Sequence, residues 1–412
     1  MEDRQSFCKS TWALPLFCLT VAITVFSQIT PLSKVMRPAM YIMWGVLFLL
    51  PLATGERKIH LSPFTKVFAA AYGLFFLFCL TLTLCGQNHM KANYLRVLVV
   101  PLFVTLVGDV YRTKLDRHDL ECIAKVYIIC SLIFAIWVHV VYFPSYSEWL
   151  KQMRYAYASK NSAVQVWSVS VFLLFFFIDY RWLAERILGI AIAGYLIFLC
   201  AMTQGRTALL AIAFAYCAFV AFKVEKSKKI KWIAISILAA CFLWLFLPTR
   251  QFIVHSFYLD KYAGVTVYEE EDKQEDKQEG KAETDITVDL NTFSSGRIGK
   301  YKAALRKFAS SPIWGVGNNY VDCSYILILA ESGIIGFLLI ELVWLSRALC
   351  NVFSKLNWKD STLLLCLTCF YFVESALEGY PPFGPGVCCF MFWFLSNIIC
   401  EREAFFLPKQ RE

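Results

Sequence analysis

Three charged residues in this chain could do chemistry on an anionic group: Arg206, Arg297 and Asp322. A guanidinium stays charged and can pair with two phosphate oxygens at once, so two arginines could hold a diphosphate leaving group without a metal ion. A carboxylate beside them could accept the proton of an attacking hydroxyl. Because an ordinary aspartate is a weak base, Asp322 would need partial burial to serve. The set predicts transfer of a group away from a diphosphate.

The elements that must position these residues are apolar helices. Of the 412 residues, 58% are hydrophobic and 17% are charged, whereas a soluble domain carries about 25% charged residues. We therefore predict an all-α polytopic membrane protein with about 12 transmembrane helices, each able to cross a hydrocarbon layer of roughly 30 Å. The predicted spans are 11–30, 38–54, 64–86, 94–111, 119–143, 162–180, 187–204, 207–222, 232–248, 321–346, 361–376 and 384–400.

Lysines and arginines predict the orientation, because positively charged loops stay on the cytoplasmic side. With the N-terminus inside, most loop cations fall on that side and the outer loops hold few. Both termini are then cytoplasmic, and the two arginines and the aspartate share the outer face. The net charge of +9 reflects this topology and contacts with membrane lipids, so we expect no nucleic-acid partner.

One long polar loop divides the chain into three parts. Residues 1–248 hold the first nine predicted helices, residues 249–320 form the outer loop, and residues 321–412 hold the last three helices and a cytoplasmic tail. Within the loop, residues 269–285 are almost entirely charged or polar. A segment with so little apolar surface cannot fold alone, which predicts a disordered acidic insert.

The end of the loop predicts an amphipathic helix that lies on the membrane. Four apolar residues recur at spacings of three and four among basic residues, after a possible serine N-cap: Ile298, Tyr301, Leu305 and Phe308. This helix would begin next to Arg297. The spacing by itself also fits a lipid-anchoring helix that takes no part in catalysis.

Other polar residues have two interpretations each. Acids inside apolar helices are functional by default, which applies to Glu331 and Glu341, yet Glu331 could instead pair with an arginine. Glu374, Glu378 and Tyr380 face outward and could line an acceptor groove, although a structural turn is the favoured interpretation. The 16 cysteines are mostly dispersed through apolar segments, where thiols act as small hydrophobic groups. We expect neither a metal site nor a cofactor.

Several short motifs occur in a telling order: Thr203-x-x-Arg206-Thr-Ala-Leu, then Arg297, then Pro312-Ile-Trp-Gly315-Val-Gly317, then the Tyr-Glu-Gly pattern from Asp322 to Gly336. Over roughly residues 150–345 this order resembles the O-antigen polymerase and O-antigen ligase superfamily of bacterial membrane glycosyltransferases. The resemblance implies a GT-C-like fold with one large periplasmic loop, in the bacterial inner membrane. The implied substrate is a glycan linked to undecaprenyl pyrophosphate, and a chain-length regulator is an implied partner.

The resemblance also assigns residues. Arg206 and Arg297 match the family's two arginines, and Asn161, Tyr325 and Glu331 join them as expected substrate-binding residues. Asp322 stands where the family's ligases place a histidine, which favours the polymerase branch and makes Asp322 the expected base. A metal-independent O-antigen polymerase is therefore the leading hypothesis, with an O-antigen ligase as the alternative. A flippase is a third hypothesis, but neither a repeat nor midplane charges in broken helices supports it.

Overall fold

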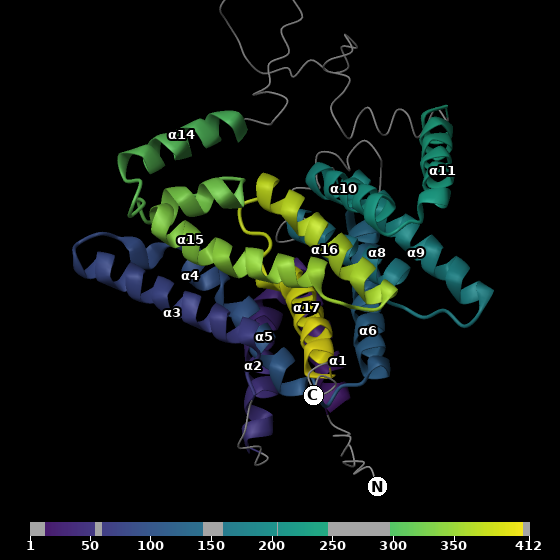
Figure 1. Cartoon of the computed structure of the whole chain (residues 1–412), viewed down its shortest axis with the longest axis horizontal. Coiled ribbons are helices and arrows are strands. Elements are labelled where there is room, and N and C mark those ends of the chain that lie inside the picture. The colour runs from purple at the N-terminus through teal and green to yellow at the C-terminus, as the bar shows by residue number, and fades with distance from the viewer. Residues whose placement is uncertain (1–12, 54–59, 143–159, 204, 246–296, 407–412) are drawn as a thin grey trace, which may run out of the picture.

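The structure, a computed structural model, describes residues 13–53, 60–142, 160–203, 205–245 and 297–406 (Figure 1). Within these ranges the chain forms helices and no strand. Most of the predicted outer loop, including the acidic insert at 269–285, lies outside the described residues.

Each predicted span overlaps a helix, with the 94–111 span divided between two of them. The helices are α1 (Ala13–Phe26), α2 (Thr30–Ala53), α3 (Pro63–Leu84), the 3-10 helix η1 (His89–Lys91), α4 (Asn93–Val97), α5 (Val99–Tyr111), α6 (Arg117–Tyr142), α8 (Lys160–Phe176), α9 (Leu183–Met202), α10 (Arg206–Phe222), α11 (Lys226–Leu245), α14 (Arg297–Ser310), α15 (Ser324–Phe353), α16 (Trp358–Leu377) and α17 (Gly386–Phe406).

Six helices in the described ranges are long and apolar enough to cross a membrane, namely Pro63–Leu84, Asn93–Tyr111, Arg117–Val141, Leu183–Met202, Ser324–Phe353 and Trp358–Leu377. Four more apolar helices are shorter than the roughly 20 residues that a span needs. The all-α membrane class is confirmed by these helices. The count of about 12 spans stays a prediction.

α17 lies at the centre of the bundle, between α5 and α8 (Figure 1). Every side chain from Cys388 to Leu395 is buried, which is what an all-round apolar helix requires. The Trp393 ring stacks on Phe383 and Phe64, with centroid distances of 5.3 and 6.1 Å. This core fixes the end of α16 and the turn that follows it, where the polar residues gather.

α15 is interrupted at Gly333, whose φ of 63° and ψ of −166° leave the helical region. The preceding connection packs into this break: Val316 N donates to Ala330 O and Gly317 N to Glu331 O, both at 2.9 Å. A Cβ on Gly333 would lie 2.3 Å from the Ile313 carbonyl oxygen, so only glycine fits this approach. The two glycine motifs therefore form one structure that holds the connection before α15 in place.

α14 is confirmed as a helix at the predicted residues and lies across the outer part of α15 (Figure 1). Ala304 is the buried residue on the inner side of α14, while most of the basic side chains of this helix stay exposed. The Tyr301 hydroxyl donates to the Asp322 carbonyl oxygen at 2.5 Å. This packing brings the first residue of α14 to the end of α16.

Candidate functional site

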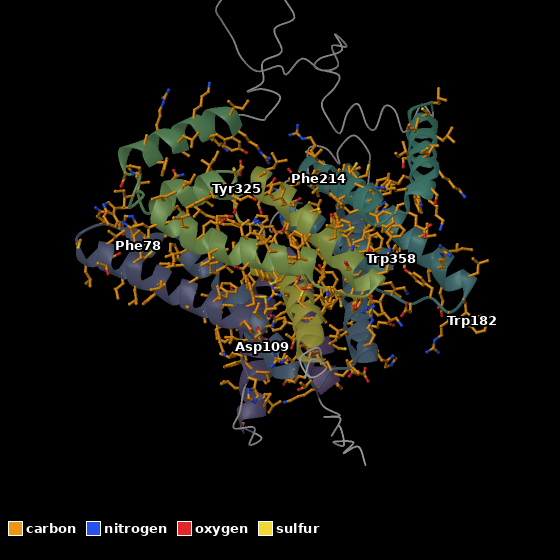
Figure 2. The ribbon with its side chains drawn as sticks, viewed as in Figure 1. Phe78, Asp109, Trp182, Phe214, Tyr325 and Trp358 are labelled. Carbon is orange, nitrogen blue, oxygen red and sulfur yellow. The ribbon has the colours of Figure 1, made fainter. Side chains whose placement is uncertain are left out.

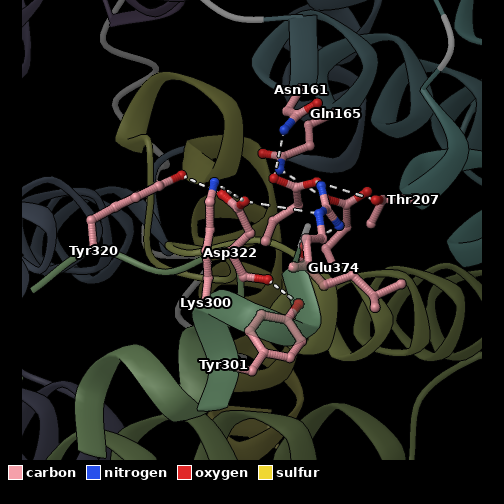
Figure 3. A network of polar contacts seen from close by, with 11 residues as sticks. Asn161, Gln165, Thr207, Lys300, Tyr301, Tyr320, Asp322 and Glu374 are labelled. Carbon is pink, nitrogen blue, oxygen red and sulfur yellow. Dashed lines mark hydrogen bonds and ion pairs between the residues drawn. The ribbon is translucent and has the colours of Figure 1, made fainter. Parts of the chain in front are cut away.

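Arg297 is the central cation of a polar network at the end of α16 (Figure 3). Its Nη1 donates to the Leu377 carbonyl oxygen at 2.7 Å, and its Nη2 donates to Glu378 Oε1 at 2.9 Å. Its Nε lies 3.9 Å from Asp322 Oδ2. Burial disfavours the charged guanidinium, but Glu378 and Asp322 outweigh this cost and raise the pKa of Arg297. The Nη edge is therefore engaged, while the Nε edge is held loosely.

Asp322 lies in the connection just before α15 and is held by α14. Tyr320 Oη donates to its Oδ1 at 2.9 Å, and Lys300 Nζ lies 3.7 Å from its Oδ2. The Asp322 side chain is 18% exposed. Two cations at 3.7 and 3.9 Å are close enough to attract the carboxylate but too far for hydrogen bonds. The carboxylate thus keeps room for a partner.

Glu378 links four helices through a single carboxylate. Its Oε1 accepts from Arg297 and from Thr207 Oγ1 at 3.1 Å, and its Oε2 accepts from Asn161 Nδ2 at 2.5 Å. These donors come from α14, α10 and α8. Burial raises the pKa of Glu378, and the charge and hydrogen bond of Arg297 oppose that rise. The sequence offered this acid only as part of a groove or a turn, whereas the structure places it at the network's centre.

Asn161 and the start of the helix that begins at Arg206 both reach the Glu378 carboxylate. Arg206 is the first residue of α10, and the next residue, Thr207, donates to the Glu378 oxygen that also accepts from Arg297. α10 packs along α16, which holds the start of α10 beside the end of α16. The two arginines predicted to act together therefore come from helices that meet at one carboxylate.

A second acid lies one helical turn before Glu378 on α16. Glu374 Oε2 accepts from Gln165 Nε2 at 2.9 Å, and the Glu374 side chain is buried. Residues four apart share one face of a helix, and both acids accept from α8, through Gln165 and Asn161. This arrangement continues the polar network inward from the end of α16.

Glu331 belongs to a different cluster. Its carboxylate is 1% exposed and accepts from Asn93 N at 3.2 Å, Asn93 Nδ2 at 2.8 Å and Asn319 N at 3.4 Å. The partners found in the described residues are amides, so the predicted alternative of pairing with an arginine is not what the geometry shows. The buried carboxylate fastens α4 to α15. Substrate contact through Glu331 stays a prediction that this burial does not favour.

Tyr325, the remaining predicted substrate-binding residue, lies in the first turn of α15 (Figure 2). Its ring packs near Phe372 of α16, with centroids 6.5 Å apart. The Tyr325 ring therefore contributes to the packing of α15 on α16. A role for Tyr325 in binding substrate stays a prediction.

The network can act on an anionic, hydroxyl-bearing substrate. Arg297 and Lys300 offer positive charge beside a carboxylate that can accept a proton, and Lys300 is 58% exposed. No group of three or more possible metal-ligating acids, histidines and cysteines occurs in the described ranges. The described side chains can stabilise negative charge through cations and accept a proton on a carboxylate.

A comparison with protein families matches residues 190–340 to the family described as O-antigen ligase. The match covers less than half of the chain, but it contains Arg206, Arg297 and Asp322. It begins after Asn161 and ends before Glu374 and Glu378, which the structure adds to the site. The match confirms the resemblance to the O-antigen polymerase and ligase superfamily. None of the curated proteins compared with the chain matches it.

Proposed function

From the O-antigen ligase match at residues 190–340, we propose that this protein is a membrane glycosyltransferase and, more specifically, an O-antigen polymerase. It transfers a growing glycan from undecaprenyl pyrophosphate onto the end sugar of an incoming lipid-linked repeat unit. The observation that carries this proposal is the position of Arg297, whose guanidinium lies between Asp322 and Glu378 beside the start of α10. This geometry fits a diphosphate departing next to a base.

Each residue has a distinct part in the proposed step. The bond between the anomeric carbon and the diphosphate oxygen breaks, and a glycosidic bond to the attacking hydroxyl oxygen forms. Asp322 accepts the hydroxyl proton, while Arg206 and Arg297 stabilise the negative charge that develops on the departing diphosphate. Attack opposite the leaving group inverts the anomeric carbon. The chemistry assigned here to the chain's own residues uses no metal ion.

Glu378 and Asn161 act indirectly in this proposal. Glu378 holds the Nη edge of Arg297, which leaves the Nε edge toward Asp322 for the diphosphate. Asn161 fixes the second oxygen of that carboxylate. A guanidinium that is already oriented loses little freedom when the substrate binds, so transition-state stabilisation is larger.

The proposed location follows from the lysine and arginine distribution. The polar network lies on the outer face of the bundle, which in a bacterial inner membrane is the periplasmic face, and both termini are cytoplasmic. α14 then lies at the membrane surface, with its exposed basic side chains near lipid headgroups. This location suits a substrate whose diphosphate also lies at headgroup depth.

An O-antigen ligase, which would join the polymer to lipid A-core, is the second candidate because the matched family carries that description. Asp322 at the position where the resembled ligases have histidine favours the polymerase. The two functions leave different products when the protein is missing.

Lipopolysaccharide banding on a gel from a deletion strain separates the hypotheses. A polymerase mutant shows core capped by single repeats. A ligase mutant shows bare core, with polymer accumulating on the carrier lipid, and this result would remove the polymerase assignment. Loss of all surface repeats, with intermediates left on the cytoplasmic side, would identify a flippase instead.

A further inference from the structure

Tyr320 is an exposed aromatic residue whose position is nevertheless fixed. Its side chain is 53% exposed, yet its hydroxyl donates to Asp322 Oδ1 at 2.9 Å. Its ring lies 5.7 Å from the Tyr380 ring, between centroids. A Cβ on Gly379 would lie 3.1 Å from Tyr320 Cε2 and 2.8 Å from the Val321 carbonyl oxygen. The ring therefore rests directly against glycine backbone.

An exposed tyrosine usually loses conformational entropy when a ligand orders it. Here the Tyr320 hydroxyl is bonded to Asp322, one ring edge lies against Gly379, and the ring lies near that of Tyr380. Most of the conformational entropy of the Tyr320 side chain is therefore already lost on folding. About half of the residue is left to solvent, and its hydroxyl is bonded to the expected base. Aromatic rings with an apolar face and a polar tip are suited to ligands that are themselves amphipathic.

Two exposed polar side chains, those of Asn318 and Arg96, are linked through Asn93. Asn318 is exposed, and its Oδ1 accepts from Asn93 Nδ2 at 3.4 Å. The exposed Arg96 donates through Nη2 to Asn93 Oδ1 at 3.2 Å. Burial raises the pKa of Tyr380, and the positive charge of Arg96 lowers it. Asn93, which links the Asn318 and Arg96 side chains, is followed by Tyr94, whose ring centroid lies 6.2 Å from that of Tyr380. On the other side of the tyrosine pair, Tyr320 donates to the Asp322 carboxylate.

We propose that Tyr320 and Tyr380, with Asn318 and Arg96, form a saccharide subsite for the pyranose ring that carries the attacking hydroxyl. The apolar face of the sugar lies on the exposed face of Tyr320. Asn318 can both donate to and accept from sugar hydroxyls, and Arg96 donates. A few placed polar groups around an aromatic surface are typical of sites for small polar ligands.

The subsite rests on the proposed function for the role of its occupant. A sugar on Tyr320 has one edge facing the Asp322 carboxylate, because the tyrosine hydroxyl is bonded to that carboxylate. The attacking hydroxyl would then lie where its proton can be accepted. Tyr320 is accordingly a binding residue that also positions the base.

Binding without turnover tests the subsite separately from the reaction. The full-length protein in lipid nanodiscs is titrated with the water-soluble repeat-unit oligosaccharide, released from its lipid carrier by mild acid, and binding is followed by saturation-transfer NMR. Tyr320→Leu removes the ring and should raise the Kd about tenfold, whereas Tyr320→Phe keeps the ring and should stay within about twofold. Tyr41→Leu is the control at a tyrosine away from the subsite, since Tyr41 is 58% exposed on α2, within the predicted span 38–54.

The outcomes separate the two proposals. Unchanged binding by Tyr320→Leu, or equal weakening by Tyr41→Leu, overturns the subsite and leaves the polymerase assignment in place. If wild-type protein shows no saturation transfer while the strain makes normal polymer, the subsite also fails. The polymerase assignment fails only on the gel, whatever the titration shows. Size-exclusion profiles confirm that each variant is folded before its Kd is compared.

Discussion

Two arginines in this protein have acid and amide partners, but their surroundings differ. Arg347 on α15 is fully buried, donates to Asn397 Oδ1 at 2.8 Å and to the Ser396 carbonyl oxygen at 3.1 Å, and lies 3.6 Å from the centroid of the Phe64 ring. Arg297 is 24% exposed and has one acid at 2.9 Å and another at 3.9 Å. Arg347 is closed to solvent, which we call sealed, whereas Arg297 is partly exposed and its Nε makes only a long contact with Asp322.

The difference continues to the acids. Asp109 is 4% exposed, accepts from Asn397 Nδ2 at 2.9 Å and from Ser62 N at 2.7 Å, and lies near the opposite end of the bundle from Tyr325 (Figure 2). Its oxygens are engaged by fixed donors, with an amide between it and Arg347. Asp322 instead faces two cations at longer range, 3.9 Å from Arg297 and 3.7 Å from Lys300. A closed network serves the fold, whereas a network with loose contacts and solvent access can exchange partners with a substrate.

The largest expected effect comes from opening the sealed network. Arg347→Ala leaves Asn397 and Asp109 without the buried charge that completes them, and removing one member of a buried charged group costs about 3–5 kcal/mol. We expect little folded protein in detergent extracts, measured by fluorescence-detected size exclusion. A monodisperse peak at wild-type yield would show that the closed network is not structural. Arg186→Ala, at an exposed arginine on α9, is the control.

Arg297→Ala should lower activity rather than the amount of folded protein, because Arg297 is proposed to act on the substrate. We expect turnover to fall about 1000-fold, near the upper range for removal of one charge-stabilising group, while the yield of folded protein stays near wild type. Lipopolysaccharide banding gives the activity, and membrane-fraction immunoblotting gives the protein level. Arg297→Lys keeps the charge but loses the bidentate geometry, so partial activity is expected from it. Normal chain length in Arg297→Ala would remove the residue from the mechanism.

Asp322→Asn is expected to lower turnover about 100-fold, because the amide cannot accept the hydroxyl proton. The amide keeps the shape of the side chain, and Tyr320 Oη can still donate to its oxygen. Folding should therefore be unaffected, which distinguishes this change from Arg347→Ala. Polymer formation by purified protein on lipid-linked repeat units provides the rate. A rate equal to wild type would assign the proton to another acceptor.

The helices could be predicted from the sequence because their signals are local. Apolar length marked each span, and the spacing of Tyr301 with its apolar neighbours marked α14. Arg297 and Asp322 were placed together because both belong to the outer loop and its edge. The roles of Glu331 and Tyr325 in binding substrate stay predictions. The contacts found for Glu331 hold α15 to α4, and those found for Tyr325 hold α15 to α16.

The sequence could not identify Glu378 as a central residue of the network, because its contacts depend on three-dimensional packing. Its donors Asn161 and Thr207 are 217 and 171 residues away along the chain. Only the packing of α8 and α10 on α16 brings them to one carboxylate. A usable local signal was present: Glu374 and Glu378 are four residues apart at the outer end of an apolar helix, which places two acids on one helix face.

The smallest expected effect concerns the pH dependence of stability at Glu378. Burial raises the pKa of this carboxyl more than Arg297 lowers it, so the folded protein binds the proton more tightly than the unfolded chain does. The resulting stabilisation is present below the unfolded pKa and is lost as pH rises through the folded pKa. Glu378→Gln removes this titration, so its melting temperature should fall less than that of wild type as the pH is raised above the usual range of glutamate.

Thermal unfolding in detergent at a series of pH values measures the difference, with Glu225→Gln, at an exposed acid before α11, as the control. Parallel curves for wild type and Glu378→Gln would show that the pKa of Glu378 is the same in the folded and unfolded states, so that its burial and its contact with Arg297 cancel.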